Sequence, residues 1–260
     1  MTTVIAAASP LHAALAGQLV AIASGKGGVG KTWLSVTLAH AMARAGRRVL
    51  LVDADFGLAN VDIQLGLMPR VDLATVLAGT ATAADAVQRH EAGFDVLPGR
   101  SGAVSLASMA PEAVEQLLRA IRGLAGGYDI VLLDLGSGLD HAVRRLAAAS
   151  DSLVVVATEE PTSLTDAYAV LKLHARDNPA AGTARIVINQ AANQAAGRRV
   201  FLTLAQACTR YLGTAPELLG IIRRDDKVRD AIRHQVPLLQ RHPSTAAATD
   251  AEAIAAIIGG

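Results

Sequence analysis

Eight residues near the start of the chain have the types and the spacing of a phosphate-binding loop. The run GKGGVGKT occupies residues 25–32. Glycines let a loop backbone wrap closely around an anion, so that successive N–H groups point at phosphate oxygens. Lys31 is expected to reach the β- and γ-phosphates of ATP, and the Thr32 hydroxyl is expected to bind Mg²⁺. The residues predicted to bind the nucleotide here are Gly25, Lys26, Gly27, Gly28, Val29, Gly30, Lys31, Thr32 and Trp33.

The segments on either side of this phosphate loop occur in the order that phosphate binding requires. Residues 19–24 form a short apolar run, typical of a buried strand, and residues 32–45 repeat apolar side chains at helical spacing. The loop therefore lies at the N-terminus of a helix, where the helix dipole and free N–H groups attract anions. We interpret the run as a nucleotide-binding loop; a glycine-rich turn with solvated lysines is the alternative.

Polar residues follow three later apolar runs. Asp53 and Asp55 come after residues 49–52, Asp134 after residues 130–133, and Asn189 after residues 185–188. Ligands of parallel sheets bind at the carboxyl ends of strands, so these side chains are expected near the loop. Asp134 is placed to hold Mg²⁺ through water, and Asp53 to organise the metal's water. Read alone, such residues are also common in turns and helix caps.

The rest of the chain alternates short apolar runs with helical patterns. Further runs lie at residues 94–97, 153–157 and 218–222, and amphipathic segments lie at residues 111–124, 164–176 and 199–211. This alternation predicts a doubly wound α/β fold: a single, mostly parallel sheet with helices on both faces. No Pro/Gly/Ser-rich linker divides residues 18–260, so we expect one domain, preceded by a disordered extension at residues 1–17.

Lys26 narrows the class of nucleotide-binding protein, because an ordinary phosphate loop has no need of a lysine directly after its first glycine. With it, the sequence resembles the MinD/ParA family of deviant Walker A ATPases, which are SIMIBI-like P-loop NTPases. The resemblance implies an ATP-dependent homodimer in which Lys26 reaches the partner's nucleotide. It also implies that Lys26, Lys31 and Asp55 are catalytic, with Asp55 orienting the attacking water, and that Asn189 binds the adenine edge. From the residues alone, Lys26 is equally compatible with a cis phosphate contact or a solvated side chain.

Segments outside the ATPase core resemble the FlhG/FleN (MotR/YlxH) regulators of flagellar number. They lie at residues 56–62, 98–102, 158–169 and 235–237, with Pro243, Ser244 and the glycine at position 136. The resemblance implies a slow regulatory ATPase that controls flagellar number, placement and gene expression. Its implied partners are a flagellar transcription activator, a basal-body component or a partner GTPase. A MinD-type division-site ATPase or a ParA-type partition ATPase is the alternative.

Three positions depart from the family pattern. Trp33 stands where relatives carry a small polar residue, and Glu159 and Arg223 stand where proline is usual. The indole of Trp33 must either lie beside the α-phosphate or turn into the core. Two other classes that share the fold fit less well, because a metabolic ligase gives no reason for Lys26 and a self-phosphorylating tyrosine kinase needs a tyrosine-rich tail.

Composition limits the location and the partners. The chain has 260 residues, a formal net charge of +1 and one cysteine. A single cysteine permits no internal disulfide, and it argues against the nitrogenase iron protein branch of the superfamily, whose bridging iron–sulfur cluster needs more thiolates. No apolar run approaches the roughly 18 residues of a membrane-spanning helix, so we expect a cytoplasmic protein, at most peripheral at the inner face of the cell membrane. Residues 249–258 predict a helix packed on the domain, with a weak membrane contact as the alternative. The basic residues 223–233 alternate with acidic ones, which favours a solvated face over a DNA-binding patch.

Overall fold

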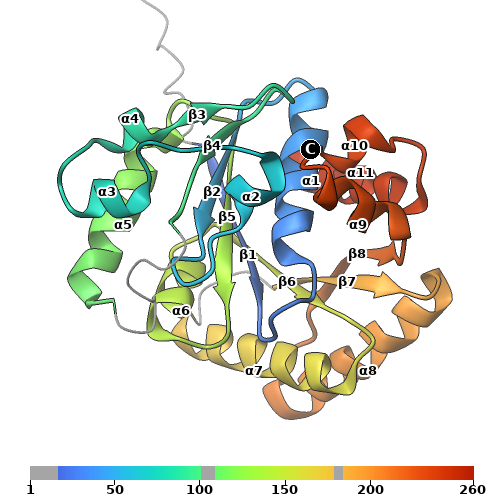
Figure 1. The fold of residues 1–260 in the computed structure, drawn as a ribbon. Helices are drawn as coiled ribbons and strands as arrows, with labels where there is room; N and C mark the ends of the chain where they lie inside the picture. Colours follow the sequence, from blue (N-terminus) through green and yellow to red (C-terminus); the bar gives the residue numbers. More distant parts are fainter. Residues whose placement is uncertain (1–16, 101–108, 179–183) are drawn as a thin grey trace, which may run out of the picture.

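The computed structural model describes residues 17–100, 109–178 and 184–260. Within these residues eight strands form one sheet in the order β3-β4-β2-β5-β1-β6-β7-β8 (Figure 1). Every neighbouring pair is parallel except β3 and β4. The strands are β1 (Gln18–Ser24), β2 (Val49–Ala54), β3 (Gln88–Arg89), β4 (Asp95–Leu97), β5 (Ile130–Ser137), β6 (Ser152–Ala157), β7 (Arg185–Ala191) and β8 (Glu217–Arg223). The predicted fold class is confirmed, whereas the predicted extension at residues 1–17 lies, except for Gly17, outside the described residues.

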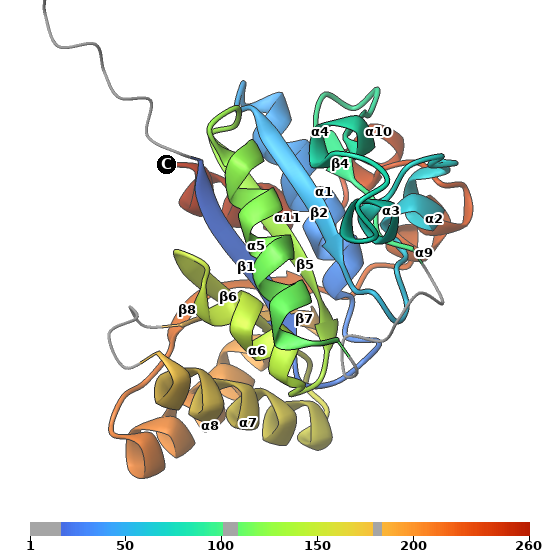
Figure 2. The ribbon, with the colours of Figure 1, turned by 90° about the vertical axis from the view of Figure 1, so that its left-hand side faces the viewer.

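Helices cover both faces of the sheet, as Figures 1 and 2 show. One face packs against α3 (Leu73–Leu77), α4 (Ala83–Ala86), α5 (Pro111–Ala125), α6 (His141–Ala148), α7 (Pro161–Asp177) and α8 (Gln194–Leu212). The other packs against α1 (Lys31–Arg44), α2 (Val61–Leu65), α9 (Asp226–Arg233), α10 (Leu238–Arg241) and α11 (Ala246–Gly259). The result is a three-layer α/β/α arrangement.

Burial on both faces explains why the central strands are apolar without interruption. Along β1, Leu19, Ala21 and Ala23 belong to one buried cluster, while Val20 and Ile22 belong to the other. Successive side chains of a strand point to opposite faces, so a strand covered on both sides needs apolar residues at every position. A strand that is buried on both faces thereby ends directly at the phosphate loop.

The C-terminal helix α11 is part of this fold. Ile254 and Ile258 are buried in the cluster that α11 shares with α1, whereas Ile257 on the same helix is 59% exposed. Gly220 of β8 makes the close approach possible, because a Cβ there would lie 2.4 Å from Ile254 Cγ1. The helix expected from residues 249–258 therefore packs on the domain, as predicted.

None of the helices in the described parts of the chain combines the length and the apolar character needed to cross a membrane.

Candidate nucleotide-binding site

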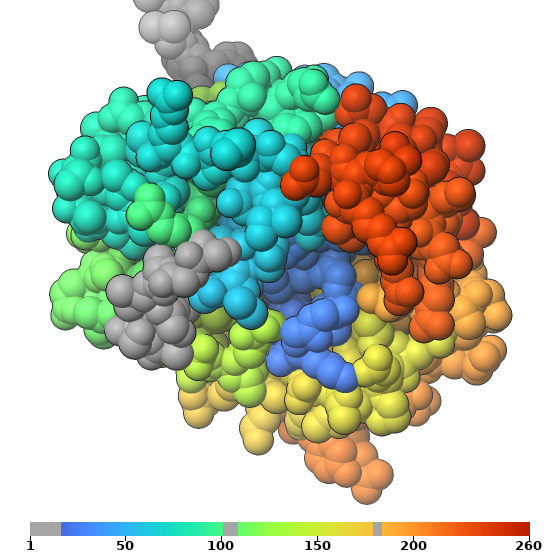
Figure 3. Space-filling view, viewed as in Figure 1, coloured from blue at the N-terminus to red at the C-terminus, as the bar shows by residue number. Residues whose placement is uncertain are grey.

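The phosphate loop lies at the carboxyl end of β1, between β5 and β6. In the space-filling view its blue residues reach the surface between yellow α7, the cyan segment after β2 and the orange-red C-terminal helices (Figure 3). Gly28 and Gly30 have φ angles of 79° and 89°, a left-handed conformation that glycine adopts without strain. A Cβ on Gly30 would lie 2.4 Å from Asn189 Nδ2, so this position also requires glycine for close approach. The loop therefore has the backbone of an anion cradle at a helix N-terminus.

Lys31 points inward, toward Asp134 at the end of β5. The lysine side chain is 7% exposed, and its Nζ lies 3.5 Å from Asp134 Oδ1. The same carboxylate oxygen accepts a hydrogen bond of 2.9 Å from Ser35 Oγ, one helical turn after Lys31. Two residues of α1 thus hold one oxygen of Asp134, and this arrangement joins the phosphate loop to β5.

Asp53 lies next to Asp134 across the β2/β5 pair, where the two residues are register partners. Its carboxylate is completely buried and accepts backbone N–H bonds from Asp55, Asn60 and Val61, at 3.2, 3.0 and 3.0 Å. Burial and the nearby charge of Asp134 raise the pKa of Asp53 to about 7, against the opposing effect of these donors. Asp53 therefore organises the loop after β2. A cation placed beside Asp53 and Asp134 would favour the ionised form of both carboxylates.

The surroundings of Asp134 fit a hydrated Mg²⁺. Its second oxygen, Oδ2, is buried and has no hydrogen-bond partner among the described residues. A buried carboxylate oxygen without a partner is costly, and a metal-bound water would satisfy it. No group of three or more acidic, histidine or cysteine side chains that could hold a metal occurs in the described ranges. Mg²⁺ does not need one, because it is usually held by one or two carboxylates together with phosphate oxygens and water.

A cavity of about 430 Å³ opens beside the loop. Its walls come from the loop, the end of β7 and the segment that joins β8 to α9, and they include Trp33, Asn189 and Arg223. Asn189 is buried; its Nδ2 donates to Val29 O at 2.8 Å, and its Oδ1 accepts from Gln190 N at 2.8 Å. A side-chain amide has a second N–H and a second lone pair, so binding of a base edge by Asn189 stays a prediction.

The two unusual residues at this cavity are held away from its centre. Trp33 is 5% exposed and packs in the buried cluster around α1, so the indole turns into the core. Arg223 is tied to α11, because its Nε and Nη2 both donate to Asp250 at 2.9 Å. The cavity is therefore not filled by either side chain, and its size and position suit a nucleoside.

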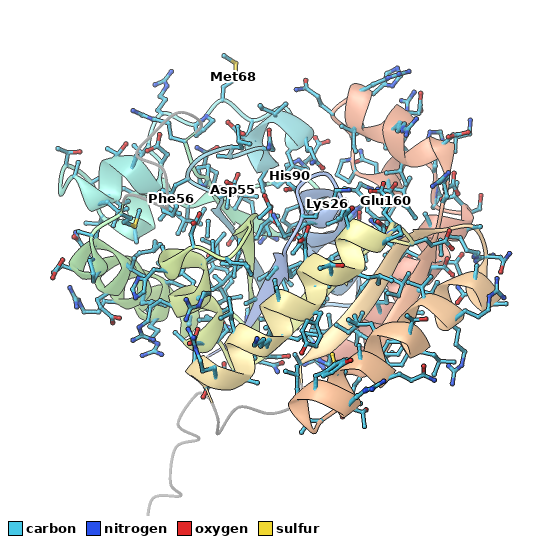
Figure 4. The ribbon with its side chains drawn as sticks, turned by 90° about the horizontal axis from the view of Figure 1, so that it is seen from below. Lys26, Asp55, Phe56, Met68, His90 and Glu160 are labelled. Atoms are coloured by element: carbon cyan, nitrogen blue, oxygen red, sulfur yellow. The ribbon has the colours of Figure 1, made fainter. Side chains whose placement is uncertain are left out.

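Lys26 differs from Lys31 in direction and in surroundings. Its Nζ donates to Thr162 Oγ1 at 2.9 Å and forms an ion pair with Glu160, both at the start of α7 (Figure 4). The lysine side chain is 36% exposed. Lys26 is thus at the rim of the site, whereas Lys31 is inside it.

Asp55 lies on the loop that follows β2. Its carboxylate is half-buried, and Oδ1 accepts a hydrogen bond of 3.1 Å from Leu58 N. The side chain is therefore engaged with its own loop, on the same side of the molecule as Lys26 (Figure 4). Its predicted role in orienting water is not tested by this geometry.

Sequence reasoning gave no role to Ser35, Glu160 or Thr162. Ser35 had a usable signal, because a polar residue four positions after the loop lysine interrupts the apolar face of α1 and must find a buried partner. Glu160 and Thr162 carried no usable signal in the sequence, because they contact Lys26 from positions 134 and 136 residues further along the chain.

Comparisons with known proteins show the family of the chain and agree with nucleotide binding. The profile of the CobQ/CobB/MinD/ParA nucleotide binding domain family matches residues 20–238. The antiactivator FleN of Pseudomonas aeruginosa is 37% identical over 92% of this chain and 85% of its own length. The flagellum site-determining protein YlxH of Helicobacter pylori is 28% identical over 93% and 81%. The septum site-determining protein MinD from Pyrococcus horikoshii, solved in complex with Mg-ADP, is 25% identical with a TM-score of 0.76, over 93% of this chain and 96% of that one.

Proposed function

This chain belongs to the CobQ/CobB/MinD/ParA nucleotide-binding family, and on that basis we propose that it is an ATP-dependent molecular switch. Binding of ATP assembles a homodimer, and slow hydrolysis to ADP and phosphate dissolves it. The output is the lifetime of the dimer rather than a chemical product.

The different placement of the two lysines carries the proposal. Lys31 is buried beside Asp134, where it can neutralise phosphate charge within its own subunit. Lys26 lies at the rim of the same loop with its side chain 36% exposed, and its Nζ contacts Glu160 and Thr162 at the start of α7. A cation at the rim of a phosphate site is in reach of a second subunit that docks on this face, so Lys26 is assigned to act in trans.

The remaining residues of the site have separate roles in nucleotide binding and hydrolysis. The loop N–H groups and Lys31 hold the phosphates, and Asn189 positions the loop while facing the base cavity. Thr32 and Asp134 would hold Mg²⁺, with Asp53 ordering the water around it; when bound, the metal neutralises charge that develops on the transferred phosphoryl group. Asp55 orients the attacking water by accepting a hydrogen bond from it. Each of these roles suits the residue type and its place, either at a strand end or at the start of α1.

We assign the cellular role to regulation of flagellar number, placement and gene expression, supported by the similarity to FleN and YlxH. The partner is then a flagellar transcription activator, a basal-body component or a partner GTPase. The similarity to MinD supports a second candidate, a division-site or partition ATPase. For either role we infer a cytoplasmic protein with transient membrane contact at most. DNA binding is disfavoured because Asp250 neutralises Arg223 and Asp230 pairs with Arg241.

The mass of the protein in solution tests the switch. With a non-hydrolysable ATP analogue the wild-type protein should have the mass of a dimer, and with ADP that of a monomer. Lys26→Ala should still bind the nucleotide, because Lys31 and the loop amides remain, but should stay monomeric with the analogue. A Lys26→Ala variant that dimerises as readily as the wild type would show that the trans role is wrong.

A further inference from the structure

Asp250 of α11 is a buried acidic residue that the proposed hydrolysis does not use. Its side chain is 8% exposed. Oδ2 accepts from Arg223 N at 3.0 Å and from Arg223 Nε at 2.9 Å. Oδ1 accepts from Arg223 Nη2 at 2.9 Å and from Gln194 Nε2 at 3.1 Å. Each oxygen of this carboxylate therefore accepts two hydrogen bonds, and all four come from residues outside α11.

The residues that Asp250 binds belong to, or support, the wall of the cavity beside the phosphate loop. Arg223 itself lines the cavity, together with Ile222 and residues 224–226. Gln194, at the start of α8, also donates from Nε2 to Ile221 O at 3.1 Å, so one side-chain amide joins β8 to Asp250. Asp250 is not among the residues that line the cavity, and it therefore supports this wall from behind.

The same wall is also fixed on its other side, and α11 is itself firmly docked. Arg224 N donates to Ala191 O at 2.8 Å, which ties the segment after β8 to the end of β7. Ile254, one helical turn after Asp250, is buried and lies against Gly220. The segment after β8 is thus held between β7 and α11, and Asp250 supplies the contact with α11.

From these contacts we propose that Asp250 positions the wall that receives the base of the nucleotide, so that the docking of α11 sets how tightly the base is bound. The inference rests on the proposed binding of a nucleotide at this cavity. It concerns a single subunit and involves neither dimerisation nor the reaction of the phosphates. Because coupling between two sites is reciprocal, a nucleotide in the cavity should also stabilise the docking of α11.

Replacing Asp250 with asparagine removes this support without changing the size of the side chain. An asparagine amide has one acceptor oxygen, and its NH₂ group can only donate. Whichever oxygen of Asp250 is replaced, two of the four bonds lose their acceptor, and a donor then faces a donor. The wall should therefore loosen at Arg223, while α11 keeps its apolar packing through Ile254.

The test compares the binding of ADP and of inorganic pyrophosphate, each with Mg²⁺, by isothermal titration calorimetry. ADP carries the base, whereas pyrophosphate offers only phosphate groups to the loop. Asp250→Asn should bind ADP about 3- to 30-fold more weakly than the wild type, as expected when one or two hydrogen bonds no longer order the wall, and its affinity for pyrophosphate should change by less than about twofold. Arg223→Lys keeps a charged donor for Asp250, so its affinity for ADP should lie between the two.

The matched control is Glu252→Gln, on the same helix. Glu252 pairs with Arg44 of α1 at 2.9 Å, and neither residue lines the cavity. This variant should bind ADP and pyrophosphate like the wild type. Hydrogen exchange of residues 246–258 gives a second measurement that does not depend on pyrophosphate. ADP should slow the exchange of these amides in the wild type, and slow it less in Asp250→Asn.

The outcomes separate this inference from the proposed function. If Asp250→Asn binds ADP like the wild type, or loses ADP and pyrophosphate binding in parallel, the inference is wrong and the switch stands. The same holds if ADP binds to the wild type but does not slow exchange in α11. A wild type that binds ADP no more tightly than pyrophosphate would show that the cavity does not hold the base, which overturns both this inference and the role proposed for Asn189. If the wild type binds neither compound, the proposed function itself fails.

Discussion

Asp53 and Asp55 stand two residues apart, yet their surroundings give them different tasks. Asp53 is fully buried and accepts three backbone N–H bonds, so it holds the loop in shape. Asp55 is half-buried and accepts one, from Leu58. A carboxylate that keeps free lone pairs near the rim can still accept a hydrogen bond from water. This difference is why the catalytic role is proposed for Asp55.

Replacing Asp55 with alanine should therefore stop hydrolysis without preventing nucleotide binding. We expect the rate of phosphate release to fall by about 10²-fold or more, because a positioned proton acceptor contributes at least this much, while the protein remains an ATP-bound dimer. Asp62→Ala is the matched control, since the Asp62 carboxylate accepts from Ile63 N within α2. Loss of ATP binding itself in Asp55→Ala would contradict the assignment and indicate a metal ligand.

The residues of the site differ in how far the sequence alone could locate them. Asp134 and Asn189 follow apolar runs that end at the same edge of a parallel sheet, so pattern and fold class together place them near the loop. The bond from Asn189 Nδ2 to Val29 O was not predictable, because it depends on which of several nearby acceptors the amide N–H meets. Glu160 was not predictable either, since a helix-start glutamate is normally solvated and only the packing of α7 on Gly25 brings it to Lys26.

Among the elements, those with long apolar runs were predictable and those held mainly by hydrogen bonds were not. The run at residues 130–133 indicated a strand, but β5 continues to Ser137. Asp134 and Leu135 keep pairing with β2, and Ser137 pairs with Ser24 of β1. The two-residue strand β3 carries no apolar signal and exists only by antiparallel pairing with β4. Strand ends of this kind depend on neighbours that a local pattern does not contain.

The packing of α11 gives a prediction at the same scale. Ile254 is 1% exposed and lies against Gly220, whereas Ile257 is 59% exposed. Ile254→Ala should lower the free energy of unfolding by about 2–5 kcal/mol through lost burial and the cavity left behind. Ile257→Ala should change it by less than about 0.5 kcal/mol, as expected for an exposed residue. Denaturant unfolding of the two variants measures both values, and equal effects would mean that α11 does not pack as described.

For the whole molecule, the proposed role predicts a cellular phenotype. Deletion of the gene should change the number or the position of flagella. The Asp55→Ala protein, fixed in its ATP-bound form, should bind a flagellar transcription activator or basal-body component more tightly than the ADP-bound wild type does. Counting flagella by electron microscopy, together with a binding assay in each nucleotide state, checks both expectations.

The opposite pattern would identify the second candidate. Normal flagella combined with misplaced septa or with loss of plasmids would assign the protein to a division or partition role. The assignments of Lys31, Asp55 and Asp134 would not change, because they depend on the phosphate loop and the strand ends and not on the partner.

The place of Trp33 has a practical consequence for all of these experiments. It is the single tryptophan of the chain, and it lies in the wall of the cavity that suits a nucleoside. The fluorescence of an indole depends on the polarity and rigidity of its surroundings. Light emitted by the protein at tryptophan wavelengths therefore comes from one known position, in the wall of the cavity beside the phosphate loop. The native chain thus contains its own optical probe of nucleotide binding, and no label has to be attached near the site.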